Sequence, residues 1–111
     1  MRRSGWMAVS AAAAAMAFVI PAIAAEPVVV TLKDHKFIPA EIRVRANSPA
    51  ELALTNADST AEEFDSSALK VEKVVVGGQT GIVRLRPLAP GRYPFMGEYH
   101  SDTARGVVIA R

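Results

Sequence analysis

The stretch EIRVRANSPAELALT, residues 41–55, decides the fold class. Its first five residues alternate polar and apolar side chains, with Ile42 and Val44 on the apolar side, and its last five residues alternate in the same way through two leucines. A period of two is typical of β-strands that bury one face. The Asn-Ser-Pro sequence at 47–49 is a turn signal. We therefore predict two half-buried strands joined by a short turn.

The rest of the chain repeats this arrangement of short strands and turns. Further strands are predicted over residues 28–33, 62–69, 72–76, 80–86, 92–95 and 106–110. No stretch has a convincing amphipathic helical pattern, although residues 66–70 are compatible with a single helical turn. About seven short strands in one small domain predict an all-β fold, an antiparallel β-sandwich.

The first 24 residues have the layout of a secretory signal peptide. Arg2-Arg3 provides a positive start, residues 11–20 are apolar, and residues 22–24 read Ala-Ile-Ala. This order is typical of a cleaved leader, and the apolar run is shorter than the about 20 residues of a membrane-spanning helix. We expect cleavage after residue 24, with residues 25–111 forming one domain. An uncleaved membrane anchor is the alternative.

The charge balance argues against nucleic-acid binding. The chain has 13 Lys and Arg against 11 Asp and Glu, a formal net charge of +2. The surplus consists of Arg2 and Arg3, so that residues 25–111 carry 11 charges of each sign and have no net charge. Binding to nucleic acid requires a concentrated positive surface, and the predicted mature domain lacks the composition for one.

The chain contains no cysteine. Disulfides, thiol nucleophiles, iron–sulfur clusters and copper–thiolate centres are therefore excluded. A small exported domain without disulfides must be stabilised by its core or by a bound ligand. The Gly77-Gly78 pair lacks the residues of a phosphate-binding loop, and no serine or threonine lies in a nucleophile motif.

The segment from Tyr93 to Asp102 carries the most informative polar side chains. If this segment is extended, Met96, Glu98 and His100 lie on one face. A thioether, a carboxylate and an imidazole on one short segment are a plausible set of metal ligands. The alternative is a hydrophobic strand end followed by a solvated loop.

A second polar cluster is Glu62-Glu63-Phe64-Asp65. Extended geometry puts Glu63 and Asp65 on one face and Phe64 in the core. Adjacent acidic residues usually form a solvated edge, so this cluster gains weight only if the fold brings it to the first one. His35, between charged residues at a strand end, is a third candidate, although such a histidine is more often exposed and does not bind a metal.

Two phrases of the sequence resemble the cupredoxin-like domains. They are DHKFIPAEI at residues 34–42 and the pattern Tyr-x-Phe-x-Gly-Glu-x-His at residues 93–100. The resemblance covers nearly all of residues 27–110 and is strongest to the periplasmic cupredoxin-like component of bacterial iron-transport systems, which works beside an iron permease. It implies a Greek-key β-sandwich, a periplasmic location, and binding of iron, copper or both in iron uptake. Assistance of Fe(II) oxidation before permease entry is a further expectation from the same resemblance.

The resemblance also implies that the blue-copper ligand set has been lost. The first histidine ligand of the electron-transfer cupredoxins looks replaced by Glu63, and the cysteine ligand by Gly97. The methionine position falls near Ala104, whereas His100 keeps the later histidine. Met96 is the thioether that remains nearby.

The expected metal site combines carboxylates, imidazoles and one thioether where the loops of the sandwich cluster. Its residues are Glu63, Glu98, His100, Met96, Asp65 and His35. An oxygen-rich set without thiolate suits Fe(II), Fe(III) or Cu(II) better than Cu(I). Two alternatives stay open, a copper carrier or tolerance protein using the two histidines and the methionine, and a metal-free β-sandwich that acts as an interaction module.

Overall fold

The computed structural model describes residues 5, 17 and 25–111, so the predicted signal peptide and its cleavage site lie outside the described residues. Nine strands and one short 3₁₀ helix make up the part of the chain described after residue 24. The elements are β1 (Val28–Lys33), β2 (Lys36–Ile38), β3 (Glu41–Val44), β4 (Ala50–Asn56), β5 (Glu62–Ser66), β6 (Val71–Val75), β7 (Thr80–Leu85), β8 (Gly91–Gly97), η1 (Glu98–His100) and β9 (Arg105–Ala110).

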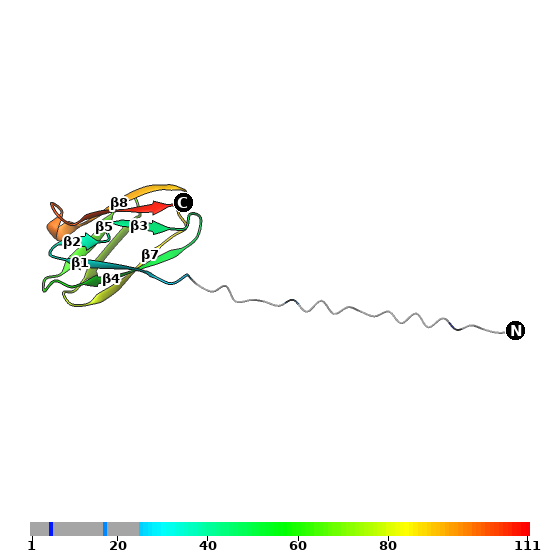
Figure 1. The fold of residues 1–111 in the computed structure, drawn as a ribbon, viewed down its shortest axis with the longest axis horizontal. Helices are drawn as coiled ribbons and strands as arrows, with labels where there is room; N and C mark the ends of the chain where they lie inside the picture. Colours follow the sequence, from blue (N-terminus) through cyan, green and yellow to red (C-terminus); the bar gives the residue numbers. More distant parts are fainter. Residues whose placement is uncertain (1–4, 6–16, 18–24) are drawn as a thin grey trace.

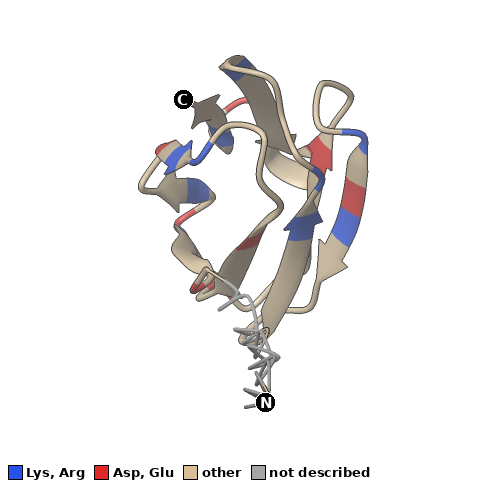
Figure 2. Ribbon diagram, turned by 90° about the vertical axis from the view of Figure 1, so that its right-hand side faces the viewer, with Lys and Arg blue, Asp and Glu red and all other residues tan. Residues whose placement is uncertain are grey.

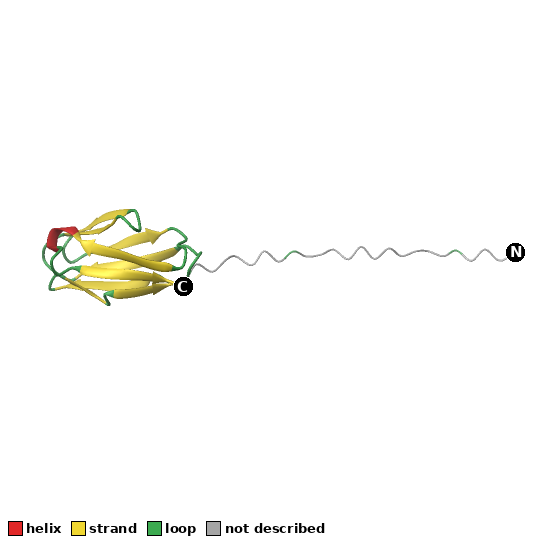
Figure 3. Ribbon diagram, turned by 90° about the horizontal axis from the view of Figure 1, so that it is seen from above, coloured by secondary structure: helices red, strands yellow, loops and turns green. Residues whose placement is uncertain are grey.

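The strands form two sheets that pack as a sandwich (Figure 1). One sheet has the order β2-β1-β4-β7 and the other β3-β9-β8-β5-β6. Figure 3 shows the strands running along the length of the domain, with loops at both ends and η1 at one of them. The predicted all-β sandwich is therefore confirmed.

Each sheet contains one parallel pair, so the sheets are mixed and not purely antiparallel. Strand β1 pairs in parallel with β4, and β3 pairs in parallel with β9, while the other strand pairs are antiparallel. Neither parallel pair has a local signal in the sequence, because its two strands are joined through other elements. Strand β2 is not predicted by the sequence pattern, because its three residues are too few to show the alternation of a strand.

The alternating residues that predicted the strands form the core between the sheets. Ile42, Val44, Leu52 and Leu54 are all buried. Beside them three phenylalanine rings contact one another. The ring centroid of Phe95 lies 5.0 Å from that of Phe37 and 4.7 Å from that of Phe64. These rings come from β2, β5 and β8, the strands that lead into the polar loops at one end of the sandwich.

The segment after β8 differs from the sequence prediction. Strand β8 ends at Gly97, and Glu98–His100 forms the 3₁₀ helix η1. The assumption that the chain stays extended through His100 is therefore wrong, and strict alternation does not place Met96, Glu98 and His100 on one face. The predicted strand over residues 62–69 is too long, because β5 ends at Ser66. Residues 67–70 form a hydrogen-bonded turn, in which the N–H of Lys70 donates to the carbonyl of Ser67 at 3.3 Å.

The charged residues are distributed over the domain in both signs. Figure 2 shows Lys and Arg interspersed with Asp and Glu along the strands, in agreement with the absence of net charge over residues 25–111. Within the described residues, no helix has the length and apolar character needed to cross a membrane.

Candidate metal centre

His35 lies in the two-residue turn between β1 and β2. Asp34 has a φ of 51° and His35 a φ of 58°, the left-handed conformation that a type I′ hairpin turn requires at both central positions. Neither residue is glycine, so other contacts must hold the turn in this conformation. The turn between β1 and β2 lies at the end of the sandwich where η1 also lies (Figure 1). The half-buried imidazole of His35 is thereby brought to His100 of η1.

Asp58 stabilises this turn from the loop after β4. Its Oδ1 accepts a hydrogen bond from the backbone N–H of Asp34 at 2.8 Å, and its Oδ2 accepts one from the N–H of His35 at 3.0 Å. The fully buried Asn56 positions the loop, because its Oδ1 accepts a hydrogen bond from the N–H of Asp58 at 3.0 Å while its amide group donates to two backbone carbonyls. The pKa of the Asp58 carboxyl is lowered, chiefly by the N–H of His35, which favours the ionised form.

Replacing Asp58 by Ala is expected to lower the free energy of unfolding by about 1.5 kcal/mol at pH 7, since hydrogen bonds to a charged acceptor contribute on that order. A lowered pKa in the folded state means that the carboxylate stabilises the fold above its ordinary pKa. The difference between parent and variant should therefore shrink as the pH falls through the carboxyl range. Urea unfolding at several pH values measures it, with Asp102→Ala, an exposed turn residue, as the control.

His100 is held by a buried carboxylate, that of Glu62. The His100 Nδ1 lies 2.5 Å from Glu62 Oε2. Glu62 Oε1 accepts backbone hydrogen bonds from Tyr99 at 2.9 Å and from Glu63 at 3.1 Å. Glu62 is fully buried, whereas the side chain of His100 is 24% exposed. One carboxylate therefore fixes both the ring of His100 and the backbone of the turn that carries it.

The two histidines are in direct contact. The ring of His35 stacks on that of His100, with centroids 3.5 Å apart and an angle of 10° between the planes. One ring comes from the turn at the edge of the four-stranded sheet and the other from the turn after β8 of the five-stranded sheet. The fold thus brings together two imidazoles and a buried carboxylate at the loop end of the sandwich.

The acidic residues predicted as ligands gather in a separate group on the outer face of the five-stranded sheet. Alternation along β5 points Glu62 inward and Glu63 and Asp65 outward. Ligand oxygens of Glu63, Asp65 and Glu72 lie within 4.8 Å of one another. The pKa of the Glu98 carboxyl is raised, chiefly by a hydrogen bond with Asp65, so this residue belongs to the same group.

The structure therefore divides the six predicted site residues between two places. His35 and His100 meet at the loop end, whereas Glu63, Asp65 and Glu98 belong to the outer acidic group. Met96 pairs with Asp65 across β5 and β8, which puts it on that outer face as well. We expected the carboxylate of Glu63 to lie near His100. The carboxylate that contacts His100 is instead that of the preceding residue, Glu62.

Two acidic residues at these places were not predicted. The alternation that puts Phe64 in the core also turns Glu62 inward, and this signal was available in the sequence. Glu72 joins the outer group because it lies opposite Asp65 in the β5–β6 hairpin. The pairing of Asp65 with Glu72 depends on the register of this hairpin. The predicted strand over residues 62–69 did not indicate where the hairpin turns, so the register could not be predicted.

Gly97 leaves space for the Glu62 carboxyl. A Cβ atom at this position would lie 2.6 Å from Glu62 Cδ and 2.8 Å from the Cβ of Ala104. The position that resembles the cysteine ligand of blue-copper proteins is therefore filled by a carboxyl group. The residues at the loop end do not fit a thiolate–copper centre, but their imidazole nitrogens are ligands that suit a Cu(II) ion.

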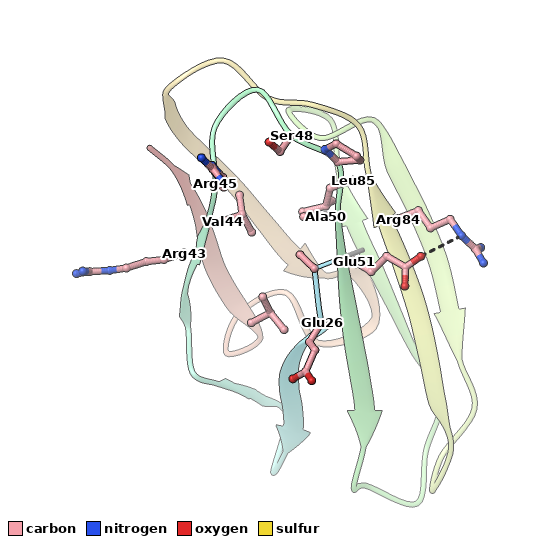
Figure 4. Close-up of a pocket in the computed structure, with 12 residues that line it drawn as sticks. Glu26, Arg43, Val44, Arg45, Ser48, Ala50, Glu51, Arg84 and Leu85 are labelled. Atoms are coloured by element: carbon pink, nitrogen blue, oxygen red, sulfur yellow. Dashed lines mark ion pairs between the residues drawn. The ribbon is translucent and has the colours of Figure 1, made fainter. Parts of the chain in front are cut away.

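A pocket of about 640 Å³ lies where β1 begins, at the opposite end of that strand from His35 (Figure 4). Its polar lining includes Arg84 and Glu51, whose side chains form an ion pair at 3.7 Å. None of the six predicted metal ligands lines this pocket. The pocket is therefore not the candidate centre, and the histidine pair and the outer acidic group are the two places that could hold a metal.

Comparison with known proteins agrees with this architecture. The uncharacterized protein RP394 of Rickettsia prowazekii (strain Madrid E) is 43% identical over 80 residues, which are 72% of this chain and 64% of that protein. The chain thus spans less than two thirds of the length of that relative.

Solved structures share the fold at low sequence identity. The metal binding domain of the Cu(I) exporting P-type ATPase CopA of Streptococcus pneumoniae, solved with Cu(I), has a TM-score of 0.68 and 16% identity over 77% of this chain and 84% of that chain. Auracyanin A, a "blue" copper protein from Chloroflexus aurantiacus, has a TM-score of 0.64 and 13% identity over 78% of this chain and 98% of that chain. A family model described as a cupredoxin-like domain matches residues 4–110, and this chain belongs to the family of cupredoxin-like domains.

Proposed function

We propose that the protein is an exported copper-binding protein that holds Cu(II) through the imidazoles of His35 and His100. The observation that carries the proposal is the stacked contact of the two rings, whose centroids are 3.5 Å apart although they come from different sheets. Imidazole is a common ligand of copper, and a set without thiolate favours Cu(II) over Cu(I). The copper-binding proteins among the structural relatives support the choice of metal.

The two imidazoles have different freedom to reorient around a metal. Parallel stacked rings direct their nitrogen lone pairs along parallel planes, so binding of one ion by both requires at least one ring to turn. His100 is held by its hydrogen bond to Glu62. Within residues 25–111, the ring of His35 has no hydrogen bond, and it is the ring that we expect to move.

Metal titration of the purified protein tests the proposal. Isothermal calorimetry is run with Cu(II), with Cu(I) and with anaerobic Fe(II). Tight, stoichiometric binding of Cu(II) is expected, because two imidazoles without thiolate suit this ion best. Absence of heat and of thermal stabilisation with all three ions would contradict the proposal and favour a metal-free interaction module.

The copper-loaded protein is expected to lack intense blue colour. Strong absorption at about 600 nm requires a thiolate bound to copper, and the chain contains no cysteine. An absorption spectrum of the protein saturated with Cu(II) measures this, with a blue-copper protein at equal concentration as the reference. A strong band in that region would contradict a ligand set without thiolate.

We also propose, from the sequence resemblance alone, that the metal site serves iron uptake beside an iron permease. Met96, Glu63, Asp65 and Glu98 stay predictions as ligands in this role. A strain that lacks the gene should take up less iron and should be rescued by the parent gene but not by His100→Ala. Unchanged iron uptake together with copper sensitivity would instead favour a copper carrier or tolerance protein.

A further inference from the structure

We propose that Glu62 is the positioning residue of the copper site, which directs the Nε2 atom of His100 to the metal and is not itself a ligand. The inference rests on the proposed copper-binding function. It starts from the finding that the Nδ1 atom of His100 is already engaged, at 2.5 Å from Glu62 Oε2. A metal can approach this ring without breaking that hydrogen bond only at Nε2.

Glu62 is held too firmly to reach a metal. Its Oε1 accepts hydrogen bonds from the backbone of Glu63 and Tyr99, and its Oε2 contacts His100. The residue is fully buried, and turning the carboxyl outward would leave backbone donors unsatisfied. Gly97 and Ala104 enclose the same carboxyl. A Cβ atom on Gly97 would lie 2.6 Å from Glu62 Cδ and 2.8 Å from the Cβ of Ala104.

The proton arrangement follows from the number of acceptors that Glu62 supplies. With Oε1 accepting two backbone N–H groups, Oε2 is the atom left to accept the Nδ1–H of His100. The neutral ring then carries its proton on Nδ1 and has its lone pair on Nε2. The opposite arrangement, a protonated Glu62 donating to Nδ1, would put the ring proton on Nε2 and block metal binding there.

The hydrogen bond also affects the strength of the ligand. A carboxylate that accepts the second N–H of a metal-binding imidazole orients the ring and makes it a stronger donor, and loss of such a partner typically reduces metal affinity about 10–100-fold. Because His35 has no such carboxylate partner within the described residues, the two imidazoles have unequal roles. His100 is the fixed ligand and His35 the adaptable one.

The first measurement needs no variant. Two-dimensional ¹H–¹⁵N NMR of the metal-free parent protein at about pH 8, where histidine is generally neutral, reports which nitrogen of His100 is protonated. The expected result is the Nδ1–H form. A dominant Nε2–H form would overturn the inference, whatever the protein binds.

The second measurement compares Glu62→Gln with Glu51→Gln, a change of the same kind at the carboxylate on β4 that pairs with Arg84 away from the histidines. Glu62→Gln should release the Nδ1–H preference of His100 and weaken Cu(II) binding about 10–100-fold. Glu51→Gln should leave the tautomer unchanged and the affinity within about threefold of the parent. If the parent binds Cu(II) and Glu62→Gln leaves tautomer and affinity unchanged, this inference fails alone. If the parent binds no Cu(II), the proposed function fails with it.

Discussion

Replacing His100 by Ala should weaken Cu(II) binding by at least about 100-fold, because even loss of a residue that only supports a metal ligand typically costs about 10–100-fold. His100 is the ring that the buried Glu62 already holds, at 2.5 Å, so the protein supplies this ligand without having to order it on binding. Calorimetry with Cu(II), or competition against a chelator of known affinity, measures the change.

Two further variants make this result specific. His35→Ala should also reduce affinity, but by less, since its ring lies on a turn and must reorient to share the ion. Arg84→Ala is the matched control, because this exposed side chain on β7 pairs with Glu51 on a face away from the histidines. Binding by His100→Ala at the level of Arg84→Ala would show that the copper site lies elsewhere.

Replacing Gly97 by Ala should lower the free energy of unfolding by about 3 kcal/mol, the upper part of the usual range for overpacking a core. The added methyl group would lie 2.6 Å from Glu62 Cδ and 2.8 Å from Ala104 Cβ. Neither neighbour moves easily, since Ala104 is fully buried and Glu62 is fixed by its hydrogen bonds. Displacing Glu62 would also disturb His100, so Cu(II) affinity should fall together with stability.

Urea unfolding measures the loss, and Gly91→Ala is the control on the same strand. A Cβ at Gly91 would have its nearest contact at 3.6 Å, with the ring of Tyr93, which is ordinary packing. Gly91→Ala should therefore be neutral or slightly stabilising, because alanine has less conformational freedom to lose on folding than glycine. Equal stability of the two variants would mean that the space around Gly97 adapts to the added methyl group.

Most of the fold could be predicted from alternation. Ile42, Val44, Leu52 and Leu54 were assigned to the buried face, and all four are buried. The short β2 and the parallel pairs could not be predicted in this way, because alternation reports which face of a strand is buried and not which strand lies beside it.

The candidate site was predicted in part. His35 and His100 were named as candidates, but their contact depends on two turns from different sheets meeting at one end of the sandwich. Glu62 was missed because a glutamate beside a second acidic residue is usually solvated, and its partner is 38 positions away. The chain turns after Gly97, and this bend separates the histidine from the acidic residues with which a straight strand would have aligned it.

The parallel pairs have a consequence for the order in which the protein folds. In the pairing of β3 with β9, Glu41 lies opposite Val107, and in that of β1 with β4, Val28 lies opposite Leu52. Closing such long loops costs chain entropy before any contact is gained, so non-local topologies of this kind fold slowly. The two histidines belong to different sheets and meet only when both sheets have formed. Copper that binds the histidine pair would therefore bind the folded sandwich and not the unfolded chain, and it would stabilise the folded state. The fraction of protein that binds copper would then report the fraction that has folded.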